Sequence, residues 1–515
     1  MTTASVSSRQ TNSSALTGLP SRRATVRDWV GLAILMVPVL LVSIDNTVLS
    51  FALPAISIEL TPTANTLLWI TDIYPLVLAG LLVAMGSLGD RIGRRRILLI
   101  GTFGFAAVSA LASLAPSAEW LIAARAGLGF FGAMLMPATL SLIRTIFTDA
   151  RQRTLAVAIW AASFSVGMSL GPVLGGLLLQ NFSWRAVFFM AVPLLLPMLA
   201  GRWLLPESRN PNPGRVDLIS VGLSLLTLVP LVLSIKTVAH EGLSALAVGS
   251  LVLGVAAGVA FVRRQLRSAN PLLDMRLFAI KPFTVAIVAN LLSFFSVVGF
   301  TFFEAQQLQL VLGYEPFTAG LLLVPAAVAA VIAGLGAVAL VKRVPKRHAM
   351  SAGLLIAAMA YAVLIVAPEP IGVIALVVGS VVLSIGLGLA ETVANDVIVA
   401  SVPADRAGAA AGVSETAYEL GTVLGFAVLG TIITTVYRNN VDLPAGLSAE
   451  QEQNARETLG GAVRVSESLS AGDASALLRS AATAFDSGVG VAAIIAMVVM
   501  IAAAVVVNRA MRPAR

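Results

Sequence analysis

Two glutamates four residues apart carry the strongest chemical signal in the sequence. Glu415 and Glu419 stand at positions i and i+4 of a long apolar run, so a helix over this run places both carboxyl groups on one face. Two carboxylates so close in a medium of low dielectric cannot both ionise at low cost. We therefore expect the pair to bind and release a proton, and to attract a lipophilic cation that could displace it. The alternative is a polar helix face of ordinary acids along a water-filled vestibule. Asp396 fits that alternative, whereas Glu391 is a further candidate for proton or cation binding.

Three more charged residues lie inside apolar runs of the first third of the chain, namely Asp45, Asp72 and Arg125. A charge at the centre of a membrane helix costs roughly 2.5 to 3.5 kcal/mol on insertion scales. We therefore expect each of these residues to have a functional or structural role. At a rise of about 1.5 Å per residue, all three lie at a similar depth in the outer half of the membrane. They are candidates for proton coupling or cation binding, with a buried ion pair that locks helices together as the alternative. Glu304, near the outer end of its run, is expected at the membrane interface.

The elements that must position these groups are apolar runs long enough to cross the roughly 30 Å hydrocarbon core of a bilayer. The sequence predicts fourteen of them, at 30–54, 67–89, 97–115, 120–142, 155–179, 186–205, 217–237, 243–262, 283–304, 317–341, 349–367, 371–393, 408–436 and 486–508.

Composition agrees with an all-α polytopic membrane protein. Of the 515 residues 58% are hydrophobic and only 12% charged, which is too little charge for a soluble globular protein. The formal charge of +8 comes from short basic patches between the runs, which indicates positive-inside topology rather than nucleic-acid binding. With both termini in the cytoplasm, most Lys and Arg residues fall on the cytoplasmic side. Lys236 is one of the few assigned to the outside.

Several kinds of site are not expected. The chain has no cysteine and only two histidines, His240 and His348, so we predict no disulfide, no metal site and no histidine-based triad. It has no Gly-x-x-x-x-Gly-Lys-Ser/Thr loop for ATP. No cofactor is predicted, and no loop is long enough for an enzyme domain of ordinary size.

The segment 86–96 joins the second and third runs. Its glycines predict a tight turn, and its arginines hold the loop in the cytoplasm. The candidate gating residues here are Gly86, Asp90, Arg91, Gly93 and Arg94. A similar segment at 338–348 keeps the basic residues but has Lys342 in place of Asp90. We therefore assign a cytoplasmic latch to Asp90, and assign Arg94, Arg95 and Arg96 mainly to orientation.

The fifth run carries a glycine face with a proline in it. Glycines along one face allow close helix contact, and the proline is a candidate hinge or seal. The residues are Gly167, Gly171, Pro172, Gly175 and Gly176. Residues 421–430 repeat the spacing at an offset of 254, and segment 338–348 repeats 86–96 at an offset of 252.

Two such repeats predict two six-helix bundles related by internal repetition, a plan typical of secondary transporters. The predicted divisions are a disordered cytoplasmic tail at 1–28, an N-terminal bundle at 29–205, a linker with two inserted helices at 206–270, a C-terminal bundle at 271–508 with an extracytoplasmic loop at 438–485, and a cytoplasmic tail at 509–515.

Several motifs together resemble those of the major facilitator superfamily, and more narrowly its fourteen-span drug:proton antiporters, the QacA/SmvA/LfrA-like multidrug exporters. The resemblance covers about residues 29–508. It rests on 86–96, on Leu121, Arg125 and Gly129, on the Gly171-Pro172 element, on 44–47 with 52–54, on 69–74 and on 414–421. Leu128, where the family often has a polar residue, and Lys342 depart from the pattern.

The resemblance implies a major facilitator fold and a proton-coupled antiporter that exports hydrophobic, mostly cationic compounds by alternating access. Asp90 and its arginines would form the cytoplasmic gate, and Arg125 would assist proton transfer. The expected partners are the lipid bilayer, protons and small cationic substrates, with the protein a monomer in the bacterial inner membrane. The alternatives are an exporter of an endogenous metabolite or self-made antibiotic, and a membrane-embedded enzyme or sensor.

Overall fold

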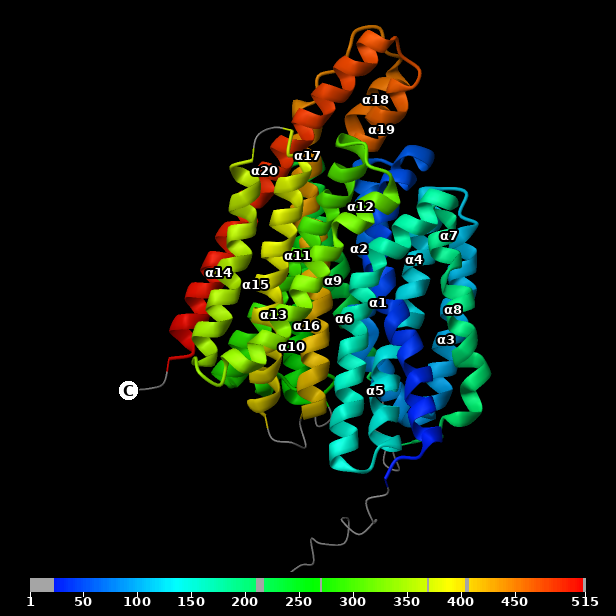
Figure 1. Ribbon diagram of the computed structural model, residues 1–515, viewed down its shortest axis with the longest axis vertical. Helices are drawn as coiled ribbons and strands as arrows, with labels where there is room; N and C mark the ends of the chain where they lie inside the picture. The colour runs from blue at the N-terminus through cyan, green and yellow to red at the C-terminus, as the bar shows by residue number, and fades with distance from the viewer. Residues whose placement is uncertain (1–22, 210–216, 269–270, 368–369, 403–406, 513–515) are drawn as a thin grey trace, which may run out of the picture.

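The computed structural model describes residues 23–209, 217–268, 271–367, 370–402 and 407–512 (Figure 1). Fourteen helical segments in these ranges are long and apolar enough to cross a membrane, and the same ranges contain no strand. The predicted all-α polytopic fold is confirmed. Residues 1–22 and 513–515 of the predicted tails lie outside the described ranges. The helix α1 already begins at Val26, before the predicted boundary of the first tail.

The chain is described below in three parts. The N-terminal half comprises α1 (Val26–Leu60), α2 (Ala64–Ile92), α3 (Arg94–Ser113), α4 (Ala118–Gly132), α5 (Leu135–Ile146), α6 (Ala150–Asn181), α7 (Arg185–Phe189) and α8 (Ala191–Ala200), followed by the 3₁₀ turn η1 (Gly201–Leu204). The inserted pair comprises α9 (Leu218–Glu241) and α10 (Ala245–Arg267), followed by the 3₁₀ turn η2 (Met275–Ala279).

The C-terminal half begins with α11 (Lys281–Gln306) and contains two π-helical turns. Its further elements are the π-turn η3 (Gln307–Val311), α12 (Pro316–Leu322), α13 (Val324–Leu340), α14 (Lys346–Ile365), α15 (Val373–Ala400), α16 (Ala407–Gly425), the π-turn η5 (Phe426–Gly430), α17 (Thr431–Asn440), α18 (Ala449–Glu457), α19 (Leu459–Ser466) and α20 (Ala471–Ala510).

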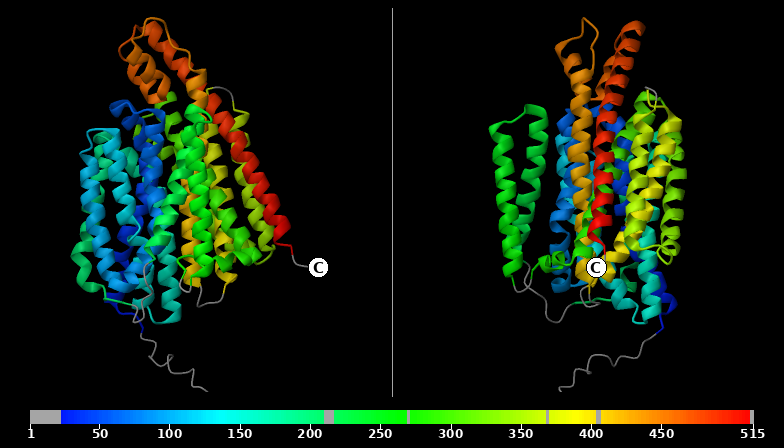
Figure 2. Two further views of the ribbon diagram at one scale, coloured as in Figure 1. Left: turned by 180° about the vertical axis from the view of Figure 1, so that it is seen from behind. Right: turned by 90° about the vertical axis from the view of Figure 1, so that its left-hand side faces the viewer.

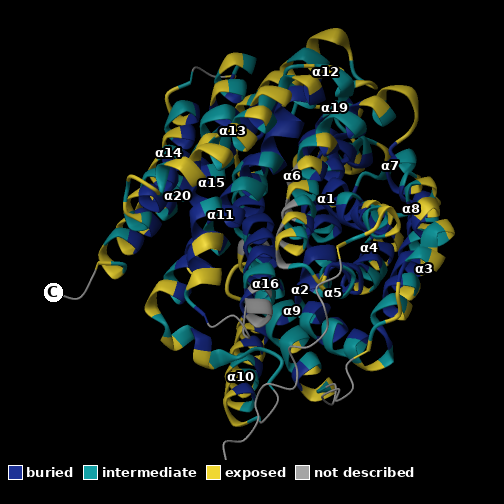
Figure 3. Ribbon diagram, turned by 60° about the horizontal axis from the view of Figure 1, so that its bottom comes forward, coloured by how far each residue is buried: buried dark blue, intermediate teal, exposed yellow. Residues whose placement is uncertain are grey.

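The helix α1 begins and α20 ends at the same end of the molecule, which we call the inner end (Figure 1). At the opposite, outer end, α18, α19 and the start of α20 project beyond the other helices. The predicted loop at 438–485 is therefore largely helical. Figure 3 shows buried residues gathered at the centre among α1, α2, α11 and α16, with exposed residues along peripheral helices such as α3 and α8.

Glycines bring α6 against α1. A Cβ atom at Gly167 would lie 2.6 Å from Cβ of Ser43, and one at Gly171 would overlap the hydroxyl of Thr47. The repeat in the C-terminal half packs in the same way, because Gly425 of α16 lies against the backbone of Phe295 in α11. Matched glycines in the two halves therefore make matched helix contacts, which is what the sequence offset predicts.

Side-chain hydrogen bonds join the two halves at the outer end. The side-chain amide of Gln180 donates a 2.9 Å hydrogen bond to Glu315. Nη1 of Arg464, in α19, donates hydrogen bonds of 2.7 and 2.9 Å to the backbone oxygens of Ile58 and Glu59 at the end of α1. The outer end is therefore held closed by hydrogen bonds from one half to the other.

Candidate functional site

A small cavity lies between the two halves, near the middle of the helices. It has a volume of about 40 Å³. That volume suits a few water molecules and is far below the roughly 300 to 1,000 Å³ of typical small-molecule pockets. A drug-sized ligand therefore requires the halves to separate. The lining comes from α1, α2, α4, α6, α11, α16 and η5, and includes Asn46, Thr47, Thr71, Arg125, Met168, Phe294, Tyr418, Thr422 and Phe426.

Arg125 and Asp45 form a buried ion pair on the N-terminal side of this cavity. Nη1 of Arg125 donates a 2.6 Å hydrogen bond to Oδ2 of Asp45, and Nε donates a 3.4 Å bond to the backbone oxygen of Ile70. The guanidinium also lies over the ring of Tyr74, 4.4 Å from its centroid. Arg125 is therefore held in one position by an acid, a carbonyl and an aromatic face.

Asp72 is not part of this ion pair and forms a separate one with Lys236. Nζ of Lys236, in α9, lies 2.6 Å from Oδ2 of Asp72, and both side chains are almost completely buried. The ammonium also lies over the ring of Trp69, 4.2 Å from its centroid. Lys236, which the charge distribution assigns to the outside, is instead buried within α9, and this helix continues beyond it to Glu241. The sequence contains one indication of this ion pair, because Asp72 and Lys236 are single charges of opposite sign in apolar surroundings.

Three glutamates lie together on the C-terminal side. Glu415 and Glu419 project from α16, and Glu391 from the neighbouring α15 interacts electrostatically with Glu415. Glu419 is buried, and its Oε2 has no hydrogen-bond partner among the described residues. Between the two α16 glutamates, Tyr418 reaches across to α6, where its hydroxyl contacts the sulfur of Met168 at 3.1 Å. An acidic cluster without a cationic partner in the described ranges thus adjoins the cavity.

Glu304, for which the sequence predicts a position at the membrane interface, is enclosed by protein. The side chain is buried and accepts a hydrogen bond from the hydroxyl of Ser380 in α15. The sequence predicts that the span ends at Glu304, but α11 passes directly into the π-turn η3. The chain therefore stays helical beyond Glu304, and the first residues of η3 are buried.

The segment 86–96 contains a single non-helical residue, Gly93, between α2 and α3. Its φ angle of 117° is one that glycine adopts easily and other residues rarely do, so the predicted tight turn is present at this residue. Gly86 lies inside α2, where a Cβ atom would be 3.3 Å from Pro137, so it serves packing and not a turn. The loop between the second and third spans is thus reduced to Gly93, whereas the sequence predicts a loop over several residues.

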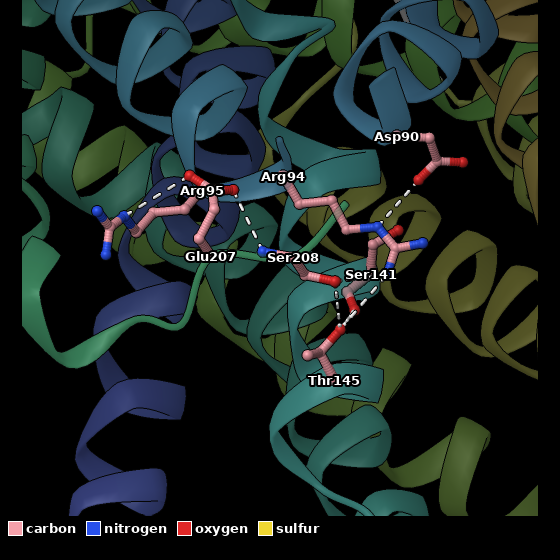
Figure 4. A network of polar contacts seen from close by, with 7 residues as sticks. All are labelled: Asp90, Arg94, Arg95, Ser141, Thr145, Glu207 and Ser208. Atoms are coloured by element: carbon pink, nitrogen blue, oxygen red, sulfur yellow. Dashed lines mark hydrogen bonds and ion pairs between the residues drawn. The ribbon is translucent and has the colours of Figure 1, made fainter. Parts of the chain in front are cut away.

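The polar residues of this segment bind within the N-terminal half (Figure 4). Nε of Arg94 donates a 2.9 Å hydrogen bond to Asp90, and its Nη1 approaches Thr145 and Ser208 at 3.4 Å. Arg95 donates a 3.1 Å bond to the backbone oxygen of Leu205. The arginines therefore also fasten α3 to the chain that follows α8, beyond the orientation role assigned to them.

The structure thus separates the candidate residues into three groups. Asp45 and Arg125 lie together, Glu391, Glu415 and Glu419 lie together, and Asp72 lies apart with Lys236. Among the described residues no group of three or more His, Cys, Asp or Glu side chains is arranged to hold a metal ion.

Comparison with known proteins agrees with this architecture. Residues 35–426 match the family described as the Major Facilitator Superfamily. The chain is 55% identical to the multidrug efflux pump LfrA of Mycolicibacterium smegmatis, over 97% of this chain and 100% of LfrA. It is 34% identical to the methyl viologen resistance protein SmvA of Salmonella typhimurium, over 89% and 93% of the two chains.

A third relative is the tetracenomycin C resistance and export protein of Streptomyces glaucescens, 30% identical over 79% of this chain and 76% of that protein. Among solved structures, a bacterial homologue of the human lysosomal transporter Spinster, in an inward-facing and unoccupied conformation, superposes with a TM-score of 0.66 at 18% identity, covering 95% and 99% of the two chains. The chain belongs to the Major Facilitator Superfamily.

Proposed function

We propose that the protein is a multidrug efflux antiporter of the bacterial inner membrane that exchanges protons for hydrophobic, mostly cationic compounds. The observation that carries the proposal is the cluster of Glu391, Glu415 and Glu419 beside the cavity between the halves. Glu419 is buried, and Glu391 and Glu415 beside it are half-buried. A buried carboxyl group without a cation favours gaining a proton or binding a positive ligand, because an isolated buried charge is costly. Proton and cation therefore compete for one site, which is the requirement of an antiporter.

The walls of the cavity suit the same class of ligand. Phe294, Tyr418 and Phe426 contribute aromatic surface, and aromatic faces attract cations whose charge is spread over a hydrophobic body. The efflux and resistance functions named for LfrA and SmvA support export as the direction.

Transport proceeds by alternating access of the two halves, proposed to move as units over residues 29–205 and 271–508. The inner end is cytoplasmic. Closure at the outer end by Gln180, Glu315 and Arg464, together with an Asp90 side chain that pairs with Arg94 of its own half, corresponds to a state ready to open inward. A proton arriving from outside releases the substrate, and the site reloads from the cytoplasm.

The test is transport in liposomes that contain the purified protein, with an imposed pH gradient and ethidium as substrate. Glu415→Gln and Glu419→Gln should each reduce gradient-driven ethidium transport at least tenfold, with normal protein yield. Glu450→Gln, at an exposed glutamate of α18, is the matched control and should leave transport unchanged. Unchanged transport in both cluster variants would contradict the assignment.

Export of a natural product made by the cell is the second candidate, favoured by the similarity to the tetracenomycin C export protein. A growth-inhibition panel on a deletion strain separates the two. Broad sensitisation to cationic drugs supports multidrug efflux, whereas sensitivity to one compound supports the dedicated exporter.

A further inference from the structure

The inserted pair lies against a seam between the two halves. At this seam α2 of the N-terminal half runs beside α16 and η5 of the C-terminal half, and α9 contacts both α2 and η5. The right-hand view of Figure 2 shows the inserted pair, in green, along one side of the other helices. Val232 of α9 forms a buried apolar cluster with Leu76 of α2 and with Val423 and Ala427 of the C-terminal half. The helix α9 therefore covers the line along which the halves meet.

The equivalent seam, where α6 meets α12 and α13, has no such cover among the described helices. The internal repeat relates α2 to α12 and α13, so Leu76 corresponds to Val328 at the offset of 252. Leu76 is 0% exposed, whereas Val328 is 51% exposed. Leu76 is enclosed by Val232 of α9 together with Val423 and Ala427 of the C-terminal half, so the inserted pair contributes to this difference in exposure.

Polar contacts fasten α9 to the N-terminal half. The Lys236 and Asp72 side chains pair at 2.6 Å without exposure to solvent. Several turns nearer the inner end, the hydroxyl of Ser224 donates a 3.0 Å hydrogen bond to the backbone oxygen of Gly80, where the absence of a Cβ admits Leu225. An ion pair, a backbone hydrogen bond and a close glycine contact together fix the position of α9 along α2.

The two inserted helices are also tied to each other, so they move together. Arg264 of α10 binds both carboxylate oxygens of Asp217, at 2.9 and 3.0 Å, and this lowers the pKa of Asp217 to about 2. Gln265 donates a 2.7 Å hydrogen bond to Ser220 beside it.

Toward η5 of the C-terminal half, by contrast, the cluster on α9 is apolar. The helix α10 has polar contacts with the connecting segment that leads to α11, where Gln265 accepts hydrogen bonds of 2.7 and 3.3 Å from the backbone N–H groups of Leu272 and Leu273. Apolar contacts lack the directional hydrogen bond or charge that fixes one partner, so they hold the register of two helices less strictly than an ion pair does. We propose that the inserted pair is a sliding seal: it travels with the N-terminal half and keeps the α2/α16 seam closed to lipid while the C-terminal half moves beneath it. This inference rests on the alternating access proposed above.

Cross-linking tests the sliding contact, and the absence of native cysteines makes paired cysteine variants unambiguous. Gly80→Cys with Leu225→Cys joins α9 to the N-terminal half, and Val232→Cys with Ala427→Cys joins it to the C-terminal half. After oxidation the first variant should keep at least half of its ethidium transport. The second should lose at least nine tenths and recover it on reduction. The reverse pattern, or the same response in both variants, would overturn the proposal.

Spin-label distances distinguish a failure of the sliding seal from a failure of alternating access. Ile100 of α3, Leu266 of α10 and Leu355 of α14 are exposed apolar positions for the labels. On adding substrate or changing pH, the distance from Ile100 to Leu355 should change and that from Ile100 to Leu266 should not. A change in the latter distance would overturn the seal alone. A fixed Ile100–Leu355 distance would overturn alternating access and the seal with it.

Discussion

Arg125 and Asp45 lie eighty residues apart in the chain, yet Nη1 of the arginine is 2.6 Å from Oδ2 of the aspartate in the buried interior between α4 and α1. Removing one partner of a buried pair leaves the other charge without compensation, which typically costs about 3 to 5 kcal/mol. Loss of either partner alone therefore destabilises the N-terminal half, and the intact pair holds two of the candidate coupling groups beside the cavity.

Asp45→Asn separates these two roles. The single variant should be destabilised, visible as a lower unfolding temperature in detergent, and should lose proton-coupled ethidium efflux. The double variant Asp45→Asn with Arg125→Gln removes both charges and should recover stability but not efflux. Recovery of efflux in the double variant would show that the pair is only a lock between helices.

Asp72 and Lys236 should behave in the opposite way. Asp72→Asn leaves the buried ammonium of Lys236 unpaired and should cost about 3 to 5 kcal/mol of stability. Asp72→Asn with Lys236→Met replaces the pair by neutral side chains, so stability, efflux and the pH dependence of efflux should return together. A stable double variant without coupled efflux would return Asp72 to the coupling role predicted from the sequence.

Gly171 should tolerate no side chain, since a Cβ atom would overlap the hydroxyl of Thr47. Overpacking at a tight helix contact costs about 1 to 3 kcal/mol, so Gly171→Ala should lower both thermal stability and efflux. Gly336→Ala in α13 is the matched control, because nothing lies within 4 Å of a Cβ there. Equal effects of the two substitutions would contradict a packing role for the glycine face.

Asp90→Asn should slow transport by weakening the latch while changing protein yield little, because its pair with Arg94 is partly exposed and such pairs contribute at most about 1 kcal/mol. Arg94→Ala also removes the contacts to Thr145 and Ser208, so its effect on stability should be the larger one. Transport rates and unfolding temperatures of both variants check this. Normal export by Asp90→Asn together with failed export by Arg94→Ala would place the latch on the arginine instead.

The unexpected pairings show where sequence reasoning stops. Asp72, Lys236 and Glu304 were each recognised as charged residues in or near apolar runs, but their depth along the chain does not give the direction in which they point. That direction depends on the rotation of each helix and on which helix is its neighbour. The helix α9 follows α2 by more than a hundred residues, so no local pattern identifies Lys236 as the partner of Asp72.

The sequence by itself determined that fourteen apolar helices cross a membrane and that glycine motifs recur in two related halves. It could do so because hydrocarbon thickness sets the length of every span. Only the tertiary structure decided which buried charges pair, that Glu391, Glu415 and Glu419 have no cation beside them in the described ranges, and that the inserted pair covers one seam. These are relations between helices distant in the chain, and packing alone brings them within bonding distance.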